Sequence, residues 1–193
     1  MQYVKSEKID IKASPELNES WVQGIIAEDP QMLGLGDLIL KDKERIQPRA
    51  GRLDLLLQDE DGHTRYEVEV QLGKSDESHI IRTMEYWDIE RKRYPQYEHV
   101  AVLVAEDITS RFLNVIGLFN GAIPFVAIQM DALKVNDITT LTFTKVLDLI
   151  EIGTEEDDES KEVTDRAYWE KKAMPETMAA ADKVLDLINE FAP

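Results

Sequence analysis

The chain has 193 residues, of which 43% are hydrophobic, and this is enough apolar material for one well-filled core. No run approaches the ~18 apolar residues of a membrane-spanning helix, and the N-terminus is too polar for a signal peptide. We therefore expect a cytoplasmic protein without a membrane partner. Cysteine is absent, which excludes a disulfide framework, and the net charge of −17 weighs against a polyanionic partner.

The first predicted element is a helix over residues 15–28, with Ser14 as its N-cap and Pro30 beyond its end. Its stripe at helical spacing includes one acid: Leu17, Trp21, Ile25 and Glu28. This stripe places Glu28 on the face that we expect to be buried. Buried acids are seldom left unpaired, so Glu28 is a candidate for holding a metal or orienting a site. The alternative is that Glu28 only ends the helix at an exposed position.

Two strands joined by a short turn are the most informative part of the sequence. An apolar strand over residues 52–57 carries Asp54, and an alternating strand over residues 67–72 carries Glu69 and Gln71. Because side chains alternate between the two faces of a strand, this hairpin separates an aliphatic face from a face with three polar residues. Clustered carboxylates repel unless a cation lies between them, and carboxylate oxygens suit Mg²⁺ or Mn²⁺. Zinc is a poor candidate because the three histidines are scattered.

A second helix is predicted over residues 76–94, where Pro95 ends it. One side of this helix is apolar, and the opposite side carries His79, Arg82, Tyr86, Glu90 and Arg93. Guanidinium and phenol groups on one face can hold a phosphate or stack a base, so His79, Arg82 and Tyr86 are candidate nucleic-acid-binding residues. The alternative is an ordinary solvated helix face.

The remaining elements indicate an α/β fold. A strand near residues 38–46 precedes the hairpin, and a strand over 100–105, a helix over 110–120 and a strand over 123–128 have the spacing of a parallel crossover unit. A further strand or strand-turn is predicted over 140–152. We therefore expect a mixed sheet of four or five strands flanked by helices, followed by a C-terminal helical segment.

The hairpin resembles the signature of the PD-(D/E)XK nuclease superfamily, which has the restriction-endonuclease-like fold, and in particular a bacterial branch of it. Asp54 matches the aspartate of the signature, and Glu69-Val70-Gln71 matches its (D/E)-x-K element with glutamine in place of lysine. Glu28 is similar in position to the acid that the superfamily carries on its first helix. The pair Arg82 and Tyr86 is similar in spacing to the Gln-x-x-x-Tyr motif of RecB-type nucleases.

This resemblance implies divalent-metal-dependent hydrolysis of phosphodiester bonds in nucleic acid, with DNA as the expected substrate. It implies that Asp54, Glu69 and Glu28 hold Mg²⁺ or Mn²⁺, and that the metal lowers the pKa of an attacking water. Gln71 would orient that water or donate to a phosphoryl oxygen. A double-strand cut needs two sites, so a homodimer is also expected.

The resemblance also divides the chain, into a nuclease-like domain over residues 1–152 and an acidic linker with a C-terminal helix over residues 153–193. Two other classes of function stay open. A catalytically silent module would keep the fold and bind nucleic acid or protein, which the glutamine at position 71 and the acidic charge favour. A metal-independent subunit of a larger complex would act through its acidic tail and C-terminal helix.

Overall fold

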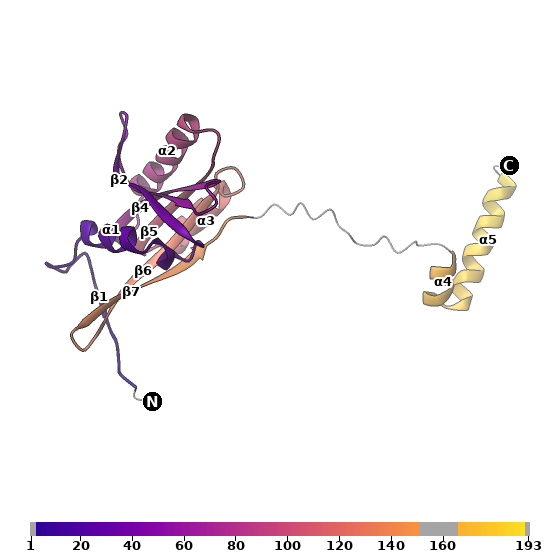
Figure 1. The fold of residues 1–193 in the computed structure, drawn as a ribbon. Helices are drawn as coiled ribbons and strands as arrows, with labels where there is room; N and C mark the ends of the chain where they lie inside the picture. Colours follow the sequence, from indigo (N-terminus) through magenta and orange to yellow (C-terminus); the bar gives the residue numbers. More distant parts are fainter. Residues whose placement is uncertain (1–2, 151–165, 192–193) are drawn as a thin grey trace. The chain divides into compact units, whose positions relative to one another are not determined.

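The computed structural model describes residues 3–150 and 166–191 (Figure 1). The chain divides into two compact units, one that ends at Glu151 and one that begins at Ile152. The acidic run expected in the linker, at residues 155–159, lies outside the described residues.

The second unit consists of α4 (Arg166–Lys172) and α5 (Pro175–Phe191), as expected of the C-terminal helical segment. The guanidinium of Arg166 binds both carboxylate oxygens of Asp182, at 2.7 and 2.8 Å, and so ties the two helices together. None of the helices in the described part of the chain is long and apolar enough to cross a membrane.

The first unit is built on one mixed sheet, which confirms the expected α/β class. The sheet has seven strands, and these are β1 (Glu7–Ile9), β2 (Leu38–Gln47), β3 (Gly51–Asp59), β4 (Thr64–Lys74), β5 (Glu98–Asp107), β6 (Phe125–Val135) and β7 (Ile138–Leu147). This is more than the four or five expected, because the N-terminal arm adds β1 and the segment after β6 forms a full strand. Both additions pair antiparallel with β6.

The connections follow the sequence prediction. Strands β2, β3 and β4 pair antiparallel through short turns, whereas β4, β5 and β6 run parallel. The two parallel connections are made by α2 (Glu77–Arg93) and α3 (Ser110–Phe119), because parallel neighbours need a crossover. The parallel strand β5 is buried on both faces, as its continuous apolar run predicts.

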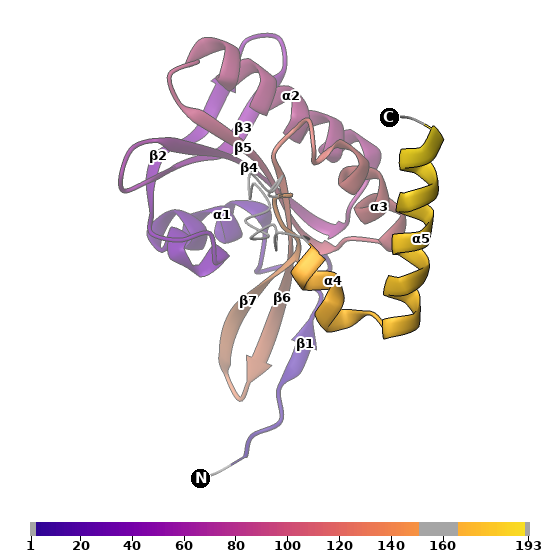
Figure 2. The same cartoon turned by 90° about the vertical axis from the view of Figure 1, so that its right-hand side faces the viewer.

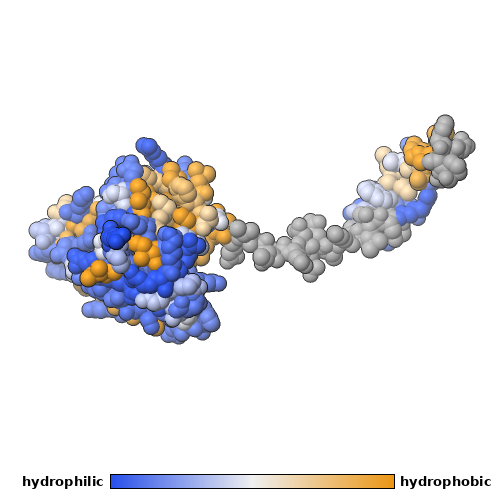
Figure 3. All heavy atoms as spheres, turned by 90° about the horizontal axis from the view of Figure 1, so that it is seen from above, coloured by the Kyte–Doolittle hydropathy of each residue, from blue (hydrophilic) through white to orange (hydrophobic). Residues whose placement is uncertain are grey.

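Helix α1 (Glu19–Glu28) and the short 3-10 helix η1 (Pro30–Leu33) lie on one face of the sheet, and α2 and α3 lie on the other (Figure 2). Alternate residues of β5 divide accordingly: Val102 packs in the core beneath α1, while Leu103 packs beneath α2 and α3. On the face of the first unit seen in Figure 3, hydrophilic residues predominate and apolar ones are interspersed. Both layers therefore enclose the strands that carry the candidate acids.

Helix α1 begins four residues later than predicted. Its N-cap is Asn18, whose side chain accepts a hydrogen bond from Trp21 N at 2.9 Å. The predicted cap, Ser14, instead accepts from Leu17 N at 3.3 Å within a separate turn. Asparagine satisfies the free N–H groups of a first helical turn as well as serine does, so the chain offered two caps, and the second begins the helix.

Candidate active site

The hairpin of β3 and β4 opens at Asp54. Its paired register runs from Gln58 opposite Arg65 to Leu55 opposite Val68 and goes no further. Beyond that point the N–H of Val70 donates to Asp54 Oδ2 at 2.7 Å in place of a cross-strand carbonyl. The carboxylate of Asp54 is therefore held between the two strands, and its side chain is only 7% exposed.

Glu69 is more deeply buried, at 1% exposure. Its Oε1 lies 3.0 Å from the guanidinium of Arg82, and its Oε2 has no hydrogen-bond partner in the described structure. Burial raises the pKa of the Glu69 carboxyl to about 9, and the nearby charge of Asp54 raises it further. A single half-exposed arginine thus compensates the negative charge of this pair of acids only in part.

Burial also raises the pKa of Asp54, to about 6, although the hydrogen bond from Val70 opposes this shift. The charge of Glu19 adds to the increase for both acids. Two neighbouring carboxyl groups with raised pKa values mark a place where the fold has concentrated negative charge at a cost in stability. Such places are enriched in functional sites.

Asp54 opens onto a cleft with a volume of about 420 Å³. Residues from α1, β2, β3 and α2 line this cleft: Asn18, Glu19, Ser20, Gln23, Glu44, Arg52, Asp54 and Arg82. Arg52 is tied to Glu44 at 3.4 Å in an exposed ion pair. The cleft therefore presents two acids and two arginines to solvent around the buried carboxylate.

The expected burial of Glu28 is wrong. Glu28 is the last residue of α1 and is exposed, because the helix buries a different stripe, made up of Val22, Gln23 and Ile26. Glu19, in the first turn, is the acid of α1 that lines the cleft. The signal was available in the sequence, since Glu19 precedes Val22, Gln23 and Ile26 by three, four and seven residues. It was missed because the predicted helix began at Pro15.

Gln71 is buried on the same strand as Glu69, two residues further on. Its Nε2 donates to Lys74 O at 2.8 Å and to Asp76 Oδ2 at 3.2 Å, and both partners can only accept. Its Oε1 has no partner among the described residues. The expected donation from Gln71 to a phosphoryl oxygen is therefore not available, but Oε1 can accept a hydrogen bond from a water and orient it.

The predicted polar face of α2 separates into exposed and buried parts. Arg82 is half-buried and reaches Glu69, and its Nε donates to Tyr86 Oη at 3.2 Å. Tyr86 itself is 0% exposed, and its hydroxyl donates to Ala50 O at 3.1 Å. The expectation that Tyr86 contacts nucleic acid by stacking is wrong, because its ring packs against Leu53 and Leu56 of β3. Its observed contact is to support Arg82.

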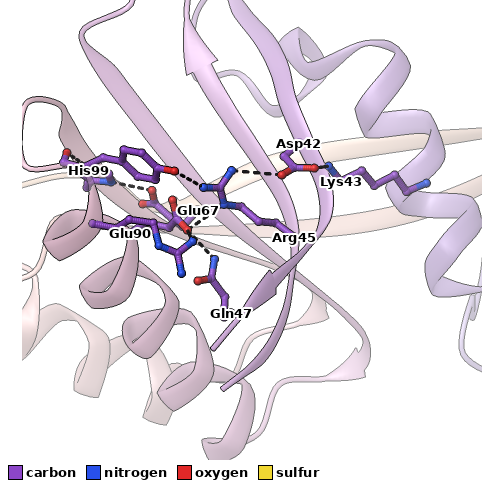
Figure 4. Close-up of polar contacts among 9 residues, drawn as sticks. Asp42, Lys43, Arg45, Gln47, Glu67, Glu90 and His99 are labelled. Atoms are coloured by element: carbon purple, nitrogen blue, oxygen red, sulfur yellow. Dashed lines mark hydrogen bonds and ion pairs between the residues drawn. The ribbon is translucent and has the colours of Figure 1, made fainter. Parts of the chain in front are cut away.

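The solvated alternative for this face is also wrong at Glu90, which is fully buried (Figure 4). Its Oε1 accepts from Arg45 at 3.0 Å, from Gln47 at 2.8 Å and from Arg93 at 3.0 Å, which fastens β2 to α2. A single buried carboxylate with three donors acts as a structural anchor behind the cleft.

His79 lies one helical turn before Arg82 and is half-buried. Its Nδ1 lies 2.9 Å from Asp76 Oδ1, and its backbone N–H donates to the same oxygen at 3.0 Å. The hydrogen bond from His79 lowers the pKa of Asp76 to about 2, so this carboxylate stays ionised at neutral pH. Asp76 is also the N-cap of α2 and joins His79 to Gln71.

The residues brought together can be tested for their fit to a metal. Within the described ranges, no group of three or more histidine, aspartate or glutamate residues is clustered as a complete metal site. Asp54 and Glu69 nevertheless supply carboxylate oxygens, and the buried Glu69 Oε2 lacks a partner. Hard oxygen donors with uncompensated negative charge fit Mg²⁺ or Mn²⁺, with water and substrate completing the shell.

Comparison with known proteins gives matches of fold only. No protein-family profile and no curated protein sequence matches the chain. A repair endonuclease from Pyrococcus abyssi aligns with 21% identity and a TM-score of 0.46 over 54% of this chain and 45% of that chain. EndoMS in apo form aligns with 19% identity and a TM-score of 0.42 over 54% of this chain and 44% of that chain.

SfsA from Pyrococcus furiosus, in complex with Ca²⁺, aligns with 10% identity and a TM-score of 0.44 over 74% of this chain and 70% of that chain. The chain spans less than half the length of the two endonucleases that it matches. These similarities agree, for the fold alone, with the restriction-endonuclease-like resemblance predicted from the sequence.

Proposed function

We propose that the first unit is a Mg²⁺- or Mn²⁺-dependent nuclease that hydrolyses phosphodiester bonds of nucleic acid, with DNA as the substrate. The observation that supports this proposal best is the pair of buried carboxylates, Asp54 and Glu69, whose pKa values are raised and which stand beside an open cleft. An acid pair of this kind destabilises the fold unless a cation binds there, so its presence is best explained by a cation that functions there.

In this proposal Asp54 and Glu69 hold the cation, and Glu19 adds negative charge at the mouth of the cleft. When bound, a divalent cation supplies an activated water and stabilises the charge that develops on the phosphoryl group. Gln71 Oε1 accepts a hydrogen bond from the attacking water and fixes its orientation. Arg82 binds a phosphate oxygen with the N–H groups that face the cleft.

The acidic surface limits long-range attraction of DNA, so binding relies on the cation and on arginines within the cleft. A homodimer that places two clefts on one duplex stays a prediction, as does the cytoplasmic location.

The proposal is tested by titrating metal-free protein with Mn²⁺ in a calorimeter and then incubating the same protein with circular and linear DNA. We expect saturable Mn²⁺ binding and metal-dependent cleavage, with both lost in Asp54→Asn. Glu85→Gln, at an exposed position of α2, is the matched control and should leave both unchanged. Absence of both binding and cleavage in the wild type would refute the proposal.

A catalytically silent module is the second candidate, and one observation favours it. The guanidinium of Arg82 already occupies a position beside Glu69 where a cation would bind, so the fold carries an internal counter-ion. In that case DNA or a protein would bind in the cleft without hydrolysis. Mn²⁺-independent binding of DNA together with absence of cleavage would select this candidate.

A further inference from the structure

The second inference concerns the proton that hydrolysis must deliver, and it rests on the proposed function. Cleavage of a phosphodiester leaves a sugar oxygen that needs a proton. The groups beside the acid pair do not supply one easily: Gln71 does not titrate, and an arginine does not give up its proton in a protein. Asp54 and Glu69 are committed to the cation.

His79 is the remaining group with suitable chemistry. It stands three residues before Arg82 on α2, so the two side chains lie on the same helix face, and Arg82 contacts Glu69. A charge on His79 lowers the pKa of Asp54, which places the imidazole within electrostatic reach of the acid pair. Histidine is the side chain that most readily gains and loses a proton near neutral pH.

The second observation is how the imidazole is held. Nδ1 lies 2.9 Å from Asp76 Oδ1, and Asp76 is ionised, so Nδ1 carries hydrogen and donates. This leaves Nε2 as the atom that takes up and gives away a proton. Asp76 is in turn bound by Gln71 Nε2 at 3.2 Å, which links the dyad to the strand that carries Glu69. A carboxylate that orients an imidazole and stabilises its charged form is a recurrent arrangement for proton transfer.

We infer that His79, oriented by Asp76, is the general acid that protonates the leaving oxygen of a phosphodiester bound in the cleft. The water oxygen forms a bond to phosphorus and releases a proton to solvent. The bond from phosphorus to the leaving oxygen breaks with its electron pair on that oxygen, which takes the proton of Nε2. The neutral imidazole then regains a proton from solvent. The charged groups that surround it are Asp76, Arg82, Asp54 and Glu69.

The discriminating variant is His79→Asn, because the asparagine amide can still donate to Asp76 from the position of Nδ1 but has nothing in place of Nε2. We expect kcat on DNA to fall by ~10²-fold, which is the usual contribution of one general acid. The loss should be far smaller on bis(p-nitrophenyl) phosphate, whose leaving group needs no proton. Affinity for Mn²⁺, measured by calorimetry, should not change. His63→Asn removes an exposed histidine on the β3–β4 turn and is the matched control.

A second variant separates positioning from folding. Asp76→Asn keeps a good N-cap but removes the negative charge beside Nδ1. The alkaline limb of the pH–rate profile should therefore move to lower pH, because the protonated imidazole is less stabilised. An unmoved limb would contradict the role of Asp76.

A readout without catalysis uses metal-free protein with ¹⁵N-labelled histidine. Addition of a DNA oligonucleotide should shift the Nε2 signal of His79 and leave that of His63 unchanged. The inference is overturned if wild-type protein cleaves DNA while His79→Asn cleaves both substrates equally well, or if DNA binds and the Nε2 signal does not respond. If wild-type protein neither binds Mn²⁺ nor cleaves, the proposed function fails and this inference fails with it.

Discussion

The guanidinium of Arg82 lies 3.0 Å from Oε1 of the buried Glu69, so a half-exposed cation from α2 neutralises an acid of β4. The opposite oxygen of Glu69 stays without a partner in the described structure. Arg82 is held from behind by Tyr86, which is itself fixed to Ala50. A divalent cation at the acid pair would compete with Arg82 for Glu69 and leave the arginine available to a phosphate.

This competition predicts opposite effects of Arg82→Gln on two ligands. Mn²⁺ should bind up to about fivefold more tightly, because a partly exposed ion pair contributes at most about 1 kcal/mol that the metal no longer has to displace. DNA should bind more weakly, with a salt slope reduced by about one. Calorimetry and DNA binding over a salt series measure the two effects. Arg91→Gln, at the exposed end of α2, is the control and should change neither.

The stability of the metal-free protein should fall as pH rises. The folded-state pKa values of Asp54, Glu69 and Glu67 are raised by burial, to about 6, about 9 and about 7, so the folded state binds more protons than the unfolded state between these values and the ordinary ones near 4. His99 has a raised pKa as well, and the stability that it contributes is also lost as pH rises.

We therefore expect the melting temperature of metal-free protein to be higher at pH 5 than at pH 8, by about 5 °C or more. Calorimetric melting at several pH values checks this, and addition of Mn²⁺ at pH 8 should recover the difference. Melting temperatures that increase steadily from pH 5 to pH 8 without metal would show that the acids are compensated within the fold.

Two acids of the same helix give a matched pair. Glu19→Gln should weaken Mn²⁺ binding about tenfold, as loss of a supporting group near a metal does, because Glu19 lines the cleft and acts on both buried carboxyls. Glu28→Gln should have no effect, because Glu28 is exposed at the far end of α1. Calorimetric titrations of both variants measure this. The reverse order of effects would restore the sequence-based assignment of Glu28.

The sequence predicted the acid pair because strand periodicity alone aligns Asp54 with Glu69 and Gln71. It also identified Arg82 through its spacing on α2. It failed for Tyr86 and Glu90, since helical periodicity shows that two faces differ but not that the β2–β3 hairpin covers the polar one. Glu19 was missed for a local reason, namely that the choice between two N-caps moved the buried stripe of α1.

The buried anchor at Glu90 gives a prediction about stability alone. Glu90→Gln removes the charge that accepts from Arg45, Gln47 and Arg93, and it should destabilise the fold by about 3 kcal/mol. Urea unfolding measures this loss, and Glu85→Gln on the exposed side of α2 should cost little. A near-neutral Glu90→Gln would mean that the arginines are satisfied by water.

The most direct test of the account is the melting temperature of Asp54→Asn with and without Mn²⁺ at pH 8. The change is nearly isosteric, and the asparagine oxygen can still accept from Val70. Removing one of two repelling acids should leave the metal-free variant as stable as the wild type or more stable. Millimolar Mn²⁺ should raise the melting temperature of the wild type and leave that of the variant unchanged. A severely destabilised variant together with a wild type indifferent to Mn²⁺ would show that Asp54 and Glu69 belong to a structural ion-pair network, which contradicts a metal-dependent nuclease.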